Sequence, residues 1–219
     1  MKPLFFVVML LSLWLSRVAL AELSFGGETL FLSGFGTLGG PYNLDGQAGF
    51  IRDKTQPEGA RGDGVDWAID SRLGLQATWR PSEDFESTLQ LVSKYRNDGG
   101  YRPQVTWAFL KYAFDPDAQV RVGRLGYDIY LLAESRDVGY SYLWVRPPVD
   151  SFGQVYNSYF DGLDLTLANS LGDGVLRGKL FLGQMTGTIP TSFPDLEYDL
   201  DGSILWGGRA IVERDIDIH

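Results

Sequence analysis

The sequence predicts an all-β protein whose antiparallel strands each have one apolar and one polar face. Three observations lead to this prediction: apolar and polar residues alternate along several segments, short and long connections alternate between them, and an export signal precedes them. A period of two residues places successive side chains on opposite faces of a strand. The chain has 27 glycines and no cysteine, so a hydrogen-bonded sheet must supply the rigidity that disulfide bonds give other exported proteins.

Residues 1–21 have the features of a secretory signal peptide. Lys2 precedes an apolar run that ends at Leu15, and Ala19-Leu20-Ala21 matches a cleavage site. The apolar run is too short for a helix that spans a membrane, although a short membrane anchor is the alternative reading. Cleavage would leave residues 22–219, in which no further stretch is apolar enough for a spanning helix.

Three strands are predicted in the first part of the mature chain. Residues 29–38 alternate weakly, whereas residues 70–79 alternate cleanly between apolar and polar side chains. Residues 85–95 return after a short turn with the same pattern. The apolar faces of these last two strands comprise Leu73, Leu75, Ala77, Trp79, Phe85, Leu89, Leu91 and Tyr95.

The segment 106–122 is the clearest hairpin, with a turn of Asp and Pro at 115–117 between two strands. Its polar face carries Lys111 and Arg121. Trp107 and Phe109 share the parity of Lys111, which is expected only if a loop packs against them. The apolar face comprises Ala108, Leu110, Tyr112, Phe114, Val120 and Val122.

Three more strands are predicted over 160–169, 175–186 and 204–213, which gives about eight in all. In the first of them, Leu163, Leu165 and Leu167 form an apolar face. Asp161 and Asp164 lie near its start, where they are expected to be solvated charges.

The connections between the predicted strands alternate in length without exception. Short turns lie near 81–84, 115–118 and 171–174, and aromatic residues flank them. Bacterial outer-membrane barrels have this alternation and this aromatic girdle, and strands of roughly 9–11 residues are long enough to span a bilayer with a tilt. The pattern therefore favours a transmembrane β-barrel. The long connections lie near 39–64, 97–104, 126–158 and 187–202.

Several stretches resemble the trimeric general porins of Gram-negative outer membranes. The resemblance spans most of the mature chain and is most specific in the segment after the hairpin. It implies the first half of a porin barrel, with about eight of the roughly sixteen strands of the family, because the chain ends at His219 without the terminal aromatic strand of those proteins. The matching stretches are Ser33–Gly39, Trp107–Tyr112, Val120–Arg124, Glu134–Tyr140 and Trp144–Pro148.

The resemblance also implies a function and a place. Residues 22–219 would form a partial porin barrel in the outer membrane, in contact with its lipid and assembled as a homotrimer when complete. Small hydrophilic solutes would cross it by passive diffusion. The loop at 126–158 would fold into the barrel and narrow the channel, as the loop after the fifth strand does in that family.

Opposed charges are expected at this constriction, acids on the loop and bases on the wall, separated by water. The loop acids that match are Glu134 and Asp137. Arg124 has the parity of the apolar face, so its inward direction requires a bulge or the end of the strand. The predicted channel-lining residues are Arg72, Lys94, Lys111, Arg121 and Arg124.

Catalytic and cofactor chemistry finds little support in the sequence. His219 is the only histidine, so neither a histidine-based triad nor a zinc site is available, and the chain is not expected to be an enzyme. Gly34-x-Gly36-x-x-Gly39 matches a dinucleotide fingerprint but runs into a loop and not into a helix. No cofactor or metal is expected, although a weak calcium site in a loop stays open. The formal net charge of −9 excludes nucleic acid as a favoured partner.

Two other architectures remain as alternatives. A closed eight-stranded barrel would have a structural or adhesive role, because side chains fill an interior of that size. A secreted β-sandwich would bind carbohydrate. The loop at 126–158 argues against the small barrel, since about thirty residues cannot fold inside it, and the apolar outer faces argue against the sandwich.

Overall fold

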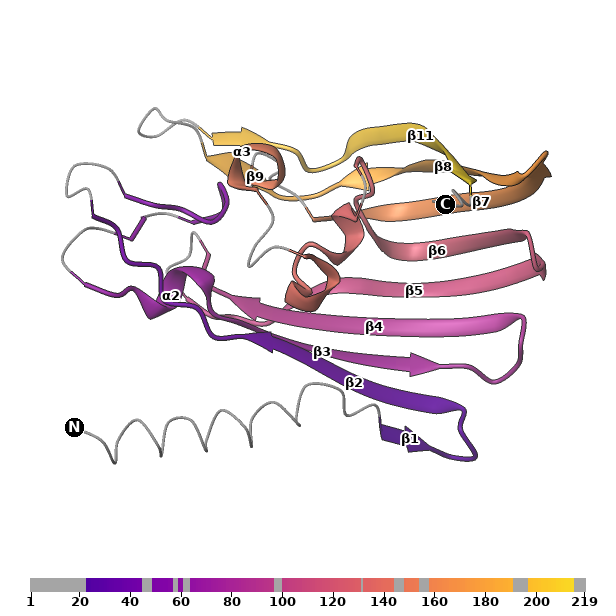
Figure 1. Ribbon diagram of the computed structural model, residues 1–219, viewed down its shortest axis with the longest axis horizontal. Coiled ribbons are helices and arrows are strands. Elements are labelled where there is room, and N and C mark those ends of the chain that lie inside the picture. Colours follow the sequence, from indigo (N-terminus) through magenta and orange to yellow (C-terminus); the bar gives the residue numbers. More distant parts are fainter. Residues whose placement is uncertain are drawn as a thin grey trace, which may run out of the picture.

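The computed structural model describes residues 23–44, 49–56, 59–60, 64–96, 100–130, 132–143, 148–153, 158–190 and 197–214. Within these ranges, nine strands form one sheet in the order β1-β2-β3-β4-β5-β6-β7-β8-β11, and every neighbouring pair is antiparallel (Figure 1). A separate two-stranded sheet pairs β9 with β10.

The strands of the large sheet range in length from three residues in β1 to thirteen in β7. Four short helices lie in the long connections: α2 (Trp67–Asp70), η1 (Ala133–Ser135), η2 (Gly139–Ser141) and α3 (Val149–Phe152). The strands are β1 (Leu23–Phe25), β2 (Leu30–Thr37), β3 (Arg72–Trp79), β4 (Phe85–Lys94), β5 (Gln104–Asp115), β6 (Ala118–Gly126), β7 (Tyr159–Leu171), β8 (Gly174–Met185), β9 (Thr188–Pro190), β10 (Glu197–Asp199) and β11 (Ser203–Arg214).

The prediction of an all-β, antiparallel fold is confirmed. Each of the eight predicted strands is present, and β1, β9 and β10 are additional short strands that the alternation did not indicate. The predicted signal peptide lies outside the described residues, and so do residues 215–219. Among the described residues, β1 and β11 are the edges of the sheet.

Short and long connections leave opposite ends of the sheet (Figure 1). The turn between β7 and β8 needs only two residues, and Gly172 there has φ 59°, a left-handed conformation that glycine adopts without steric cost. At the turn between β5 and β6, the Asp117 amide donates to Asp115 Oδ1 at 3.1 Å. The long connections gather at the other end of the sheet, where they are close enough to contact one another.

One face of the sheet is apolar and exposed on every strand from β3 to β8 and on β11. Leu75 is 59% exposed, as the parity of β3 predicts, and Trp206 on β11 is 78% exposed. We call this face the outer face. Its exposed apolar side chains include Leu73, Leu75, Trp79, Leu89, Leu110, Tyr112, Phe114, Val122, Leu163, Leu167, Leu180, Leu182, Ile204, Trp206 and Val212.

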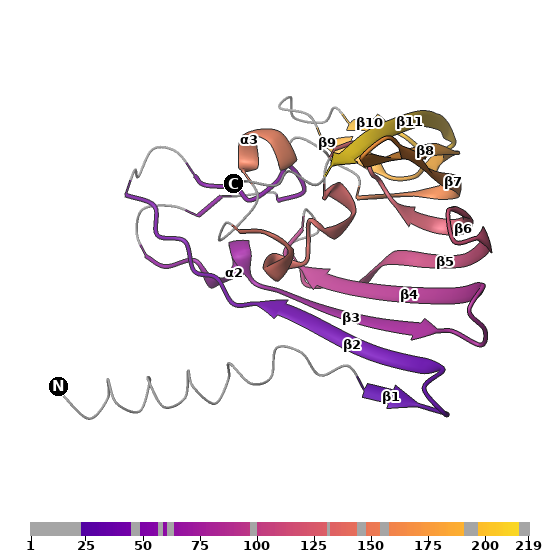
Figure 2. The same cartoon turned by 45° about the vertical axis from the view of Figure 1, so that its right-hand side comes forward.

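The opposite, inner face lies on the concave side of the curved sheet, under the connection between β6 and β7 (Figure 2). A small apolar cluster of Phe109, Leu125, Phe160 and Phe181 is buried there, and Trp107 packs against it. The two aromatic residues of β5 that share the parity of Lys111 therefore pack under a loop, as their parity required. Most of the rest of the inner face is polar.

Among the described residues, no helix is long and apolar enough to cross a membrane.

Candidate functional site

The connection between β6 and β7 is held on the inner face by ion pairs at two places. Glu134 reaches strands β6 and β8, and Asp137 reaches strands β3 and β4. Both acids come from the short stretch that includes η1, so one rigid turn of the loop spans several strands of the wall. We refer to the two groups of contacts as the Glu134 cluster and the Asp137 cluster.

In the Glu134 cluster, one carboxylate oxygen of the loop meets two cations of the wall. Glu134 Oε1 lies 2.7 Å from Arg121 Nη2 and 2.8 Å from Lys179 Nζ. Arg121 also donates to the Asp164 carboxylate, with Nε 3.0 Å from Oδ1. Asp164 is fully buried, and Lys179 Nζ lies 3.4 Å from its Oδ2. The cluster therefore balances two cations with two anions.

Asp128 extends this cluster to the edge of the sheet. It is buried immediately after β6, where Lys179 Nζ lies 2.9 Å from its Oδ2 and Arg209 Nη1 of β11 lies 2.7 Å from its Oδ1. The loop is thus tied to β6, which precedes it, and to β8 and β11, which are distant from it in sequence.

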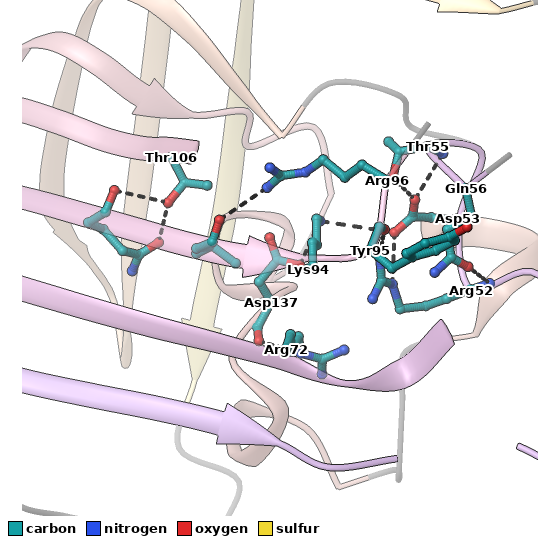
Figure 3. A network of polar contacts seen from close by, with 12 residues as sticks. Arg52, Asp53, Thr55, Gln56, Arg72, Lys94, Tyr95, Arg96, Thr106 and Asp137 are labelled. Carbon is teal, nitrogen blue, oxygen red and sulfur yellow. Dashed lines mark hydrogen bonds and ion pairs between the residues drawn. The ribbon is translucent and has the colours of Figure 1, made fainter. Parts of the chain in front are cut away.

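In the Asp137 cluster, the loop contacts the other half of the wall. Lys94 Nζ lies 2.8 Å from Asp137 Oδ1, and Arg72 Nε donates to the Asp137 carbonyl oxygen at 2.7 Å (Figure 3). Lys94 is 2% exposed and Arg72 is 6% exposed. Charged side chains buried to this degree are costly unless they are paired, so these contacts hold the loop in one position.

A second long connection, between β2 and β3, also contacts Lys94 of the Asp137 cluster. Asp53 Oδ2 lies 3.0 Å from Arg52 Nε and 4.0 Å from Lys94 Nζ. Buried Arg52 donates to the Ile69 carbonyl oxygen at 3.0 Å, and the Lys54 amide donates to the Gly153 carbonyl oxygen at 3.1 Å. Lys94 therefore sits between the acids of two loops, as Figure 3 shows.

The loop is also tied to itself. Leu132 has φ 65°, which is unusual for a residue with a branched side chain. Its carbonyl oxygen accepts hydrogen bonds from the Ser135 amide at 3.1 Å and the Tyr142 hydroxyl at 2.7 Å. Burial raises the pKa of Tyr142 to about 12, so this hydroxyl remains a donor throughout the neutral range.

The acids of the two loops titrate abnormally because cations surround them. Burial alone would raise the pKa of the Asp137 carboxyl, but Lys94 and Arg136 hold it well below its usual range. Burial would likewise raise the pKa of the Asp53 carboxyl, but the nearby cations Lys94 and Arg52 lower it. Arg121 and Lys179 likewise outweigh burial and lower the pKa of Glu134. All three carboxyls are ionised at neutral pH.

Acid is therefore expected to release the loop from the wall. A lowered pKa means that the ion pairs stabilise the docked state fully above the ordinary values of 3.8 for Asp and 4.5 for Glu. That stabilisation is lost as the pH falls below those values and through the lowered ones. Hydrogen exchange, expressed as protection factors that correct for the intrinsic exchange rate at each pH, should show residues 132–143 highly protected at pH 7 and less protected at about pH 2. Unchanged protection of this segment, with the sheet intact, would contradict a docking held by these carboxylates.

Polar cavities lie on the inner face, one between the loop and the strands and one over the strands alone. One, of about 190 Å³, lies over β6, β7, β8 and β11 and includes Arg177, Lys179 and Arg209 in its lining. The other, of about 240 Å³, lies over β3 to β6 and includes Gln76, Glu86 and Lys111. Gln119 and Arg121 line both. The cavities therefore lie side by side along the wall.

The structure brings together most of the residues predicted for the site. Arg72, Lys94, Lys111 and Arg121 lie on the inner face, and both loop acids contact cations of the wall. Asp137 pairs with Lys94. The acids and bases are in direct contact and not separated by water, so they fix the loop as well as charge the cavities.

Arg124 is the exception, and its predicted position opposite the loop acids is wrong. The pairing of β6 with β7 is regular along its whole length, so Arg124 lies on the face of Val122 and not on that of Arg121. Its Nε lies 2.8 Å from Asp161 Oδ1, and its guanidinium carbon lies 4.2 Å from the Tyr159 ring centroid. No register shift in this ladder turns it inward.

Several residues of the site were missed in the sequence. Asp164 was expected to be a solvated charge but is fully buried against Arg121. The signal was present, because Asp164 has the parity opposite to Leu163 and Leu165, and that parity faces inward. Lys179 carries the same signal on β8. Asp128, Arg52 and Asp53 lie in loops, where no periodicity predicts which way a side chain points.

No protein-family model matches the chain, and no curated protein matches it. Among the described residues, no group of three or more His, Asp or Glu side chains is placed to hold a metal ion.

Proposed function

We propose that this chain forms part of the wall of a porin in a bacterial outer membrane, through which small hydrophilic solutes diffuse passively. The observation that carries the proposal is the division of the sheet into two faces. One face is apolar and exposed on strand after strand, and the other is polar and holds a loop pinned by ion pairs. In a barrel with lipid outside and water inside, the apolar face would contact lipid and the polar face would contact water.

The outer face supports contact with lipid. A soluble protein seldom leaves a continuous apolar surface over seven neighbouring strands, because such patches aggregate. Trp79, Tyr112 and Phe114 lie at the end of the sheet where the short turns are, the level at which aromatic side chains meet the headgroups. Beyond that level, this face would contact the acyl chains.

The inner face supports a channel with a constriction. The loop crosses it between two anchor points, and the polar cavities beside the loop would line the route of the solute. The charges there belong to side chains of both signs, Arg121 and Lys179 on the wall and Glu134 on the loop. Such an arrangement sets up a local field that orients dipolar solutes and selects among ions.

The edges of the sheet support a larger assembly. The outer edges of β1 and β11 have no strand beside them among the described residues, and unpaired backbone groups are too costly to leave in lipid. Further strands would complete the hydrogen bonding in a closed barrel. By its resemblance to general porins, the completed barrel would assemble as a homotrimer.

Reconstitution into a planar lipid bilayer tests this function. The full protein is expected to insert and to produce discrete conductance steps that grow with salt concentration, because ions cross a water-filled path. Glucose or another small neutral solute at high concentration should lower the conductance by entering the same path. A protein that stays soluble without detergent, and that leaves the bilayer insulating, would contradict the proposal and favour a secreted β-sandwich.

A further inference from the structure

The wall of the cavity over β3 to β6 includes the neutral side chains of Gln76, Thr78, Thr88 and Gln119, and buried Gln90 and Thr106, which do not line the cavity, help to orient Gln76. Thr106 Oγ1 donates to Gln90 Oε1 at 2.7 Å, and Gln90 Nε2 donates to Gln76 Oε1 at 2.9 Å. Gln76 Nε2 donates in turn to Thr78 Oγ1 at 3.2 Å. These neutral groups are oriented by one another, yet each amide and hydroxyl retains a donor or acceptor. A ligand that both donates and accepts hydrogen bonds suits such a wall.

The charges of this cavity are already neutralised by protein partners. Glu86 Oε2 lies 2.7 Å from Arg80 Nε and 3.1 Å from Lys111 Nζ. Arg121 is bound by Asp164 and by the loop acid described above. A charged solute would have to displace one of these pairs, whereas an uncharged one would not. The cavity therefore favours a neutral ligand over an anion.

An aromatic surface closes the same cavity on the side of β5. Trp107 and Phe109 line it with ring centroids 6.2 Å apart and planes tilted by 55°. The Arg121 guanidinium carbon lies 5.2 Å from the Phe109 centroid and covers part of that ring, so half-buried Trp107 is the more accessible surface. Apolar C–H groups of a ligand pack against such a surface in preference to water.

Neutrality, many hydroxyls and an apolar C–H face together describe a sugar ring. We propose that this cavity is a binding subsite for a neutral pyranose sugar, whose ring faces Trp107 while its hydroxyls contact Gln76 and Gln119. At about 240 Å³ the cavity suits one ring better than a long oligosaccharide, since drug-sized ligands occupy roughly 300–1,000 Å³. The inference rests on the proposed function, because it names a class of solute for that channel.

Saturation-transfer NMR on the full protein in detergent micelles tests the subsite, with D-glucose as the probe. Glucose is expected to bind with a dissociation constant in the millimolar range, and its ring C–H protons should receive the strongest saturation. Gln76→Met removes the amide at similar volume and should weaken binding at least tenfold. The matched control is Gln184→Met, on β8 outside the cavity, which should bind glucose as the parent does. Trp107→Ala should abolish the transfer to the C–H protons.

The outcomes separate the subsite from the channel. Equal glucose binding by the Gln76→Met and Gln184→Met variants would overturn the subsite, as would competition by sodium phosphate at constant ionic strength. Conductance in a bilayer without glucose binding would overturn the sugar subsite and leave the channel standing. Glucose binding in micelles by a protein that never conducts would support the subsite and contradict the channel. Because Trp107 also packs under the loop, the Gln76→Met result decides if the Trp107→Ala variant does not fold.

Discussion

Neutralising both loop acids, by Glu134→Gln with Asp137→Asn, should release the loop and make the channel prefer anions. Each substitution takes one acidic partner away from buried cations of the wall, and breaking a buried ion pair costs about 3–5 kcal/mol. The cost should be largest at Lys94, because its side chain is only 3% accessible and water cannot replace the lost partner. Arg121 and Lys179 would then be balanced only by Asp164 and Asp128, so the local potential would become more positive.

Reversal potentials across a salt gradient measure the change in preference. The shift should be largest at low salt, where the Debye length of about 30 Å at 0.01 M extends the field of the wall across the channel. Limited proteolysis should in parallel find new cleavage between β6 and β7. The control is Asp161→Asn, which breaks the ion pair with Arg124 outside the loop contacts and should change neither measurement. A double variant with the parent's reversal potential and protease pattern would refute the role assigned to the two clusters.

A charge on the outer face should block membrane insertion, whereas the same charge one residue further along should not. Leu75 is 59% exposed on the outer face, and its neighbour Gln76 points to the inner cavity. Arginine at a lipid-facing site near the middle of the bilayer costs roughly 2–4 kcal/mol, but arginine that faces water costs little. Leu75→Arg is therefore expected to accumulate outside the membrane, and Gln76→Arg to insert almost as well as the parent.

Flotation of the protein with lipid vesicles measures this difference, with unfolded protein removed by proteolysis beforehand. Because both variants add the same charge to adjacent positions of β3, any general effect of arginine on solubility cancels in the comparison. Equal flotation of the two variants would mean that the exposed apolar face does not meet lipid.

The strands and their faces were predictable from the sequence because both depend on a local rule. Side chains alternate across a strand with a period of two, so Leu73, Leu75 and Trp79 had to share a face wherever β3 lay in the sheet. Short turns with Asp, Pro and Gly similarly join strands that are neighbours in sequence. The same rule placed Trp107 and Phe109 on the polar face, a correct prediction that was awkward until the loop covered them.

The rule also predicted part of the site. Arg72, Lys94, Lys111 and Arg121 each have inward parity, and each lies on the inner face. The rule also indicated that Arg124 faces outward, because that residue has the parity of Val122. Only an assumed bulge turned Arg124 toward the channel, and the regular ladder between β6 and β7 has no bulge there.

The sequence by itself thus determined which residues form strands and which face each side chain takes, whereas a long connection that carries acids toward a basic wall was implied by the resemblance to general porins. Only the tertiary structure decided which charges meet. Glu134 reaches Lys179 across 45 residues and Asp137 reaches Lys94 across 43, while Asp164 is buried against Arg121, which is also 43 residues away. The physical reason is that strand parity follows from the local backbone, whereas the path of a loop follows from the sum of its contacts with strands far away along the chain.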